Sequence, residues 1–177
     1  REGSMPHDAR DELWQTTFET YYDVYYYELL EEKLVRWWQR VDETTKVSVA
    51  LTASASALYG WSIWDRPYFS TIWGVLAGLA ALLSITHAAL AVPGRLNDHG
   101  EIKRRFAMLR TDLETSRYRM RINPDFPVPE FTQEFVEFRK RYSDCVQLLK
   151  DDILALDWFE RKVQATLDER LGEQIIH

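Results

Sequence analysis

The chain has 177 residues, a formal net charge of −6 at pH 7 and 28% charged residues. This acidic balance gives no reason to expect a nucleic-acid partner, because binding to phosphates requires a surplus of Lys and Arg. The only cysteine, Cys145, excludes a framework of disulfides within the chain. These features favour a mostly helical intracellular protein.

We interpret residues 1–10 as a tag remnant followed by a frayed terminus, and we expect the fold to begin after them. Residues 11–44 carry apolar side chains at steps of three and four, which predicts a long amphipathic helix. Five tyrosines gather on it: Tyr21, Tyr22, Tyr25, Tyr26 and Tyr27. They cover more than one face, which favours packing on two sides over a ligand-stacking platform.

Residues 45–92 predict a transmembrane hairpin of two spans. No charged residue lies between Lys46 and Asp65, and none lies between Arg66 and Arg95. Each segment approaches or exceeds the roughly 20 apolar residues that cross a bilayer. Aromatic side chains near the turn resemble an interfacial belt: Trp61, Trp64, Tyr68, Phe69 and Trp73. The alternative is a helix pair buried inside a soluble bundle.

Two faces of the hairpin are candidate functional surfaces. A polar stripe in the first span is either pore-lining or a packing face, and it consists of Thr45, Ser48, Thr52, Ser56 and Tyr59. A small-residue face in the second span, built around a GxxxG pattern, predicts close helix contact within the hairpin or between subunits. Its residues are Ser70, Gly74, Ala77, Gly78, Ala81 and Ser84.

His87 stands near the end of the second apolar segment. An ionisable group at membrane depth is a functional candidate, and a titrating imidazole can gate or relay protons. The alternative, which we favour, is a structural hydrogen bond to a neighbouring helix.

Lys and Arg flank the hairpin on its outer sides and are scarce at the turn, where only Arg66 is present. The positive-inside rule therefore predicts a multi-pass protein with both termini in the cytoplasm. The first apolar run begins far from the N-terminus, so we expect no signal peptide.

Residues 95–177 predict a pair of antiparallel cytosolic helices. Pro93-Gly94 should end the second span, and Asn97 or Asp98 should cap the next helix, which runs to about Arg121. Its seam repeats at steps of four and three: Ile102, Phe106, Leu109, Leu113, Ser116 and Met120. Prolines at 124, 127 and 129 predict a loop, after which one helix should run from about residue 130 to 171. The expected fold is all-α. We also expect it to be oligomeric, because the long helix from about residue 130 to 171 has more apolar surface than the shorter helix before it can cover.

No sequence motif indicates catalysis or metal binding. The sequence has no HExxH, CxxC, Walker, GxGxxG or GxSxG pattern, and its four histidines are scattered. Cys145 is more typical of a small buried residue than of a nucleophile. We therefore expect no enzyme activity, no cofactor and no metal.

The run from Lys33-Leu34-Val35-Arg36-Trp37-Trp38 through the hairpin to Arg95, with the long helix after it, resembles the SLATT group of bacterial two-transmembrane proteins. The resemblance is one of architecture and covers most of the chain. It implies an effector of the bacterial inner membrane that forms a pore or disrupts the membrane in anti-phage or other conflict defence. It carries no catalytic motif.

Two hypotheses follow. The first is an oligomeric membrane effector whose partners are the lipid bilayer and further copies of the chain. The second is a non-catalytic anchor or scaffold whose cytosolic helices dock a soluble partner, such as a signalling protein.

Overall fold

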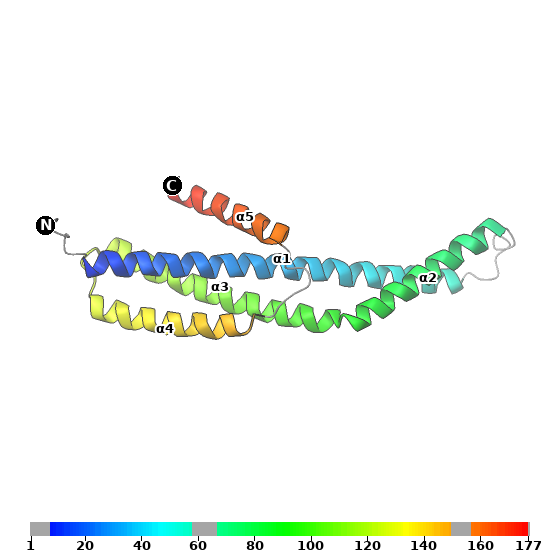
Figure 1. Ribbon diagram of the computed structural model, residues 1–177, viewed down its shortest axis with the longest axis horizontal. Helices are drawn as coiled ribbons and strands as arrows, with labels where there is room; N and C mark the ends of the chain where they lie inside the picture. The colour runs from blue at the N-terminus through cyan, green and yellow to red at the C-terminus, as the bar shows by residue number, and fades with distance from the viewer. Residues whose placement is uncertain (1–7, 58–66, 150–156, 177) are drawn as a thin grey trace. The chain divides into compact units, whose positions relative to one another are not determined.

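The computed structural model describes residues 8–57, 67–149 and 157–176. These residues form helices and the turns between them, with no strand in the described ranges, so the all-α expectation is confirmed. The helices are α1 (Ala9–Ala57), α2 (Pro67–Ala89), α3 (Val92–Ile122), α4 (Val128–Gln147) and α5 (Asp157–Ile176) (Figure 1).

Two compact units divide these helices. The first contains the described residues up to Leu34 and those from His99 onward, and the second contains Val35–Asp98. Helix α1 contributes residues to both units, because it continues without a break from the tyrosine-rich segment into the first apolar segment.

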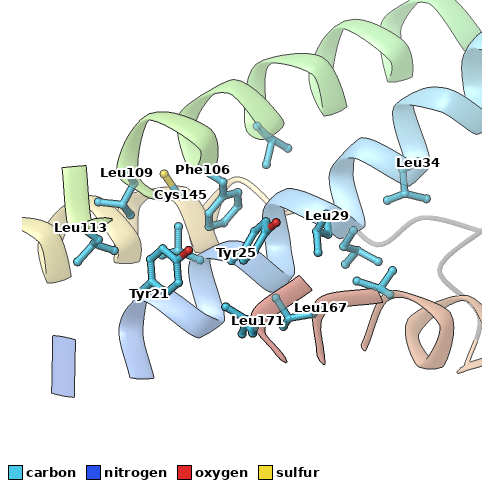
Figure 2. Packing of buried hydrophobic residues seen from close by; sticks show 14 of the residues in the cluster. Tyr21, Tyr25, Leu29, Leu34, Phe106, Leu109, Leu113, Cys145, Leu167 and Leu171 are labelled. Carbon is cyan, nitrogen blue, oxygen red and sulfur yellow. The ribbon is translucent and has the colours of Figure 1, made fainter. Parts of the chain in front are cut away.

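The first unit packs four helical segments around an apolar core (Figure 2). Helix α1 supplies Tyr21 and Leu29, α3 supplies Phe106, α4 supplies Cys145 and α5 supplies Leu167. Further members include Val24, Leu34, Leu109, Leu113, Val163 and Leu171. A smaller cluster joins Leu13, Met120, Phe126 and Phe131. Burial of this apolar surface is what holds helices from distant parts of the sequence together.

Every position of the predicted α3 seam is buried, which confirms it: Ile102, Phe106, Leu109, Leu113, Ser116 and Met120. The packing interpretation of the tyrosines is also confirmed, since Tyr21 and Tyr25 are buried and the other three pack against the core. Cys145 is buried, as predicted. Burial raises the pKa of its thiol, which opposes a nucleophilic role.

Helices α3 and α4 pack antiparallel, as predicted. Arg119 bonds Glu134 at 3.0 Å, and Arg141 bonds Asp112 at 2.7 Å. From the first pair to the second, the residue number increases along α4 and decreases along α3, as it does in an antiparallel pair. The intervening turn is closed by a hydrogen bond from the Phe126 amide to the Asn123 carbonyl.

Two predicted boundaries are wrong. Helix α4 ends at Gln147 and α5 begins at Asp157, so the helix expected from about 130 to 171 is two helices. Near Pro93, α2 has already ended at Ala89, and α3 begins at Val92. Proline is accommodated in the first turn of a helix, where its missing N–H has no intrahelical partner. Asn97 and Asp98 therefore lie inside α3 and not at its first residue.

The break between α2 and α3 occurs at Ala91, whose φ of 47° lies in the left-handed region. The Ala91 amide donates to the Ala88 carbonyl at 3.1 Å, which tightens the end of α2. Glycine usually occupies such a position because it lacks a Cβ. This residue, and not Gly94, therefore turns the chain.

Candidate membrane interface

Helix α2 has the length and composition to cross a bilayer. Its segment Thr71–Ala89 has 19 residues and a mean hydropathy of 1.7, and only 6% of it is buried within the chain. It is the single helix of this kind among the described residues. Its exposed apolar side chains are Ile72, Val75, Leu76, Leu79, Leu82, Leu83 and Ile85. The core helix of a soluble protein is mostly buried. Helix α2 is mostly exposed, so it is not a core helix of this chain.

The first predicted span is described only in part. Residues up to Ala57 are helical and belong to α1, and Val47, Val49 and Leu51 are exposed there. The remainder of that span and the Asp65-Arg66 turn lie outside the described residues, as do Trp61 and Trp64 of the aromatic belt. Tyr68, at the start of α2, is exposed.

The small-residue face of α2 is open to its surroundings. A Cβ added at Gly74 or at Gly78 would meet nothing within 4 Å. Ala77, Ala81 and Ser84 are exposed, and the side chain of Ser70 lies outside the described residues. The buried residue of this segment is Ala80, on another side of the helix. Among the described residues no atom reaches the Gly74 or Gly78 positions of this face, so contact through it, within the hairpin or between subunits, stays a prediction.

The polar stripe on α1 begins buried and becomes more accessible along the helix. Thr45 is buried, whereas Ser48 and Thr52 are half-buried. Each of the three hydroxyls donates a 2.8 Å hydrogen bond to the backbone carbonyl four residues earlier. The side chain of Ser56 and all of Tyr59 lie outside the described residues. In the described part of the stripe, the hydroxyl groups therefore donate to the backbone of their own helix.

A hydrogen bond between Asp42 and His87 joins α1 to α2 at one end of the apolar segments. His87 Nε2 lies 3.0 Å from Asp42 Oδ1, and Lys46 Nζ lies 2.6 Å from Asp42 Oδ2. Both hydrogen bonds, first that of Lys46 and then that of His87, lower the pKa of the Asp42 carboxyl. His87 thus has the interhelical bond that the structural interpretation predicted. Its partner, Asp42, was not predicted, because the two residues lie 45 positions apart in the sequence.

A second contact beside this pair involves Trp38. The Arg95 guanidinium lies 5.3 Å from the centre of the Trp38 ring, and its Nε donates to the Leu90 carbonyl at 3.0 Å. Trp38 is buried, whereas its neighbour Trp37 is 41% exposed. A cation over an indole face is an attractive contact. Together with the Asp42–His87 pair, it fixes α2 and the start of α3 against α1.

Among the described residues, no group of three or more His, Cys, Asp or Glu side chains is arranged to hold a metal ion. Comparison of the chain with protein-family models, with curated proteins and with solved structures finds no match. The geometry above, and the exposed α2 in particular, therefore carries the functional argument.

Proposed function

We propose that this chain is an oligomeric effector of the bacterial inner membrane, which forms a pore or disrupts the bilayer in anti-phage or conflict defence. The observation that carries the proposal is the exposure of α2, whose 19-residue apolar segment is only 6% buried. Apolar surface of this extent is unfavourable in water and favourable in hydrocarbon. The proposed arrangement is a two-span hairpin with both chain termini in the cytoplasm.

Assembly of several copies is the second part of the proposal. Gly74 and Gly78 have open space around their Cα atoms, so another helix can approach the α2 backbone closely there. In lipid, such close packing is a main source of helix association, because the hydrophobic effect no longer favours it. The SLATT-like layout supports the assignment to bacterial defence.

A second candidate function is a membrane anchor whose cytosolic helices dock a soluble partner. The observation that favours it is the state of the polar stripe, where Thr45 is buried and the hydroxyls of Thr45, Ser48 and Thr52 bond their own helix. Hydroxyls used in this way are typical of a packing face. In this function the hairpin localises the protein and conducts nothing.

Dye release from liposomes reconstituted with the purified chain tests the effector proposal. We expect the wild-type protein to release dye and Thr52→Leu to reduce the release rate about tenfold, because a larger apolar side chain narrows and dries a polar path. The matched control is Ser54→Leu, which makes the same kind of change on the opposite face of α1. Its exposed hydroxyl bonds the Ala50 carbonyl at 2.8 Å.

Insertion is measured in the same preparations by flotation of the liposomes. Leu82→Lys on α2 should reduce the floating fraction, because a Lys near mid-membrane costs about 2.5–3.5 kcal/mol. Met108→Lys on α3 is its control, since Met108 and Leu82 are 58% and 60% exposed. Full insertion with no dye release would refute the effector proposal and favour the anchor. Equal flotation of Leu82→Lys and wild type would refute both.

A further inference from the structure

A cavity of about 410 Å³ opens in the first unit between the start of α1 and the second half of α3. Its walls include the aromatic residues Trp14, Phe18 and Tyr21 of α1. Opposite them stand Arg117, Tyr118 and Arg121 of α3. The size lies within the range of about 300–1,000 Å³ that is usual for small-molecule sites.

Arg117 contacts all three aromatic residues that α1 contributes to the cavity. Its guanidinium carbon lies 5.0 Å from the ring centre of Trp14, 4.6 Å from that of Phe18 and 4.9 Å from that of Tyr21. Burial lowers the pKa of the Arg117 side chain from its usual value. Three rings stabilise the cation through their faces. No hydrogen bond or ion pair to the Arg117 side chain is found in the described part of the chain, and its buried Nε lacks an acceptor there.

The carboxylate that lines the cavity is already engaged. Glu114, which also lines the cavity, accepts a 3.1 Å bond from Arg110. Arg110 in turn bonds Glu28 at 2.5 Å. The residues that line the cavity include two arginines, Arg117 and Arg121, and one carboxylate, Glu114, so its lining carries one positive charge in excess. Buried charges are normally paired, so an unpaired arginine at an open cavity favours an anion as its partner.

We propose that this cavity binds a small anion that carries a flat aromatic group. Arg117 and Arg121 pair with the anionic group, because the guanidinium fork matches carboxylate and phosphate oxygens. Trp14 and the 64% exposed ring of Tyr118 offer flat surfaces to the aromatic part. The site belongs to the first unit, so it is independent of whether the hairpin conducts ions.

A purely structural role for the caged arginine makes a different prediction. In that case Arg117 only joins α1 to α3, and the cavity has no affinity for anions. The exposed Tyr118 and Arg121 would then contribute nothing measurable. Binding measurements therefore separate the two roles, whereas stability measurements do not.

Isothermal titration calorimetry of the full chain in detergent provides the test, with phenyl phosphate as the probe. Phenol and inorganic phosphate, which are the two halves of the probe, are titrated separately. We expect phenyl phosphate to bind and each half to bind at least about tenfold more weakly, since each loses one set of contacts. Titration into detergent alone corrects for partition into micelles.

Arg121→Gln should weaken phenyl phosphate binding several-fold, and Arg117→Gln should weaken it about tenfold or more. Arg117→Lys keeps the charge without the planar fork, so it covers the case in which Arg117→Gln fails to fold. Arg104→Gln, an exposed change on α3 away from the cavity wall, should leave binding unaltered. The proposal is overturned if wild type shows no binding heat at millimolar phenyl phosphate. It is also overturned if Arg121→Gln and Arg117→Lys both bind as wild type does.

Discussion

At the scale of single residues, a buried hydrogen bond between His99 and Glu31 joins α1 to α3 in the first unit. His99 Nδ1 lies 2.7 Å from Glu31 Oε2, and the two side chains are only 4% and 2% exposed. Removal of the Glu31 carboxylate leaves the buried Nδ1 atom of His99 without its 2.7 Å hydrogen-bond partner. We expect Glu31→Ala to lower the free energy of unfolding by about 1–3 kcal/mol, the usual cost of a buried polar group that loses its hydrogen-bond partner. Urea unfolding in detergent, followed by circular dichroism, measures this change.

Glu101→Ala is the control for that prediction. Glu101 pairs with Arg105 one turn away at 2.5 Å, but the side chains of this pair are 54% and 49% exposed. Exposed pairs of this spacing contribute about 0.3–0.5 kcal/mol. Similar losses for Glu31→Ala and Glu101→Ala would show that burial does not set the value of the first pair.

Pairings of this kind are the part of the site that sequence patterns do not predict. His87 stood out because it interrupts an apolar run, yet nothing local connects it to Asp42, which is 45 residues away. Likewise Trp14 and Arg117 each fit an ordinary helix face. Only the register between α1 and α3, which the core sets, brings them to one cavity.

At the scale of helices, the small-residue face of α2 gives a direct prediction. Nothing lies within 4 Å of a Cβ placed at Gly78, so Gly78→Leu fits the chain without a clash. The larger side chain does obstruct another helix that approaches this face. We expect the oligomer to dissociate about tenfold more readily, which corresponds to about 1.4 kcal/mol. Size-exclusion chromatography with light scattering, over a range of protein concentrations, measures the change.

Thr86→Leu adds comparable bulk to an exposed position of α2 away from this face, and it should leave the oligomer unchanged. An unaltered oligomer in Gly78→Leu would exclude the face as an interface between copies. Equal dissociation of both variants would instead indicate a nonspecific effect of bulk on α2.

Helix interiors were predictable from the sequence, whereas several helix ends were not. The α3 seam follows from steps of three and four alone, because one buried stripe dictates them. The end of α4 has no Gly or Pro to mark it; Leu148 closes it in a right-handed helical conformation. The turn at Ala91 has a left-handed backbone conformation that alanine seldom adopts, so the residue type at this position does not predict the turn.

At the scale of the whole chain, both apolar clusters are built from residues of the first unit. Every residue of both apolar clusters lies at or before Leu34 or after His99. The second unit keeps its own contacts, in which Asp42 pairs with His87 and Trp38 with Arg95. The two units therefore differ in what stabilises them, and changes to the apolar segments should leave the first unit folded.

Replacement of residues 50–86 by an unrelated two-span segment uses this division to separate the two candidate functions. The exchange retains Asp42, Lys46 and His87, so the ion pair at the end of the hairpin can form. We expect the hybrid to enter liposomes and to unfold in urea like wild type, because the core of the first unit is untouched. If the native hairpin is the effector, dye release should fall to the level of protein-free liposomes. Undiminished release from the hybrid would contradict the effector proposal, because the native apolar segments would then be dispensable for it.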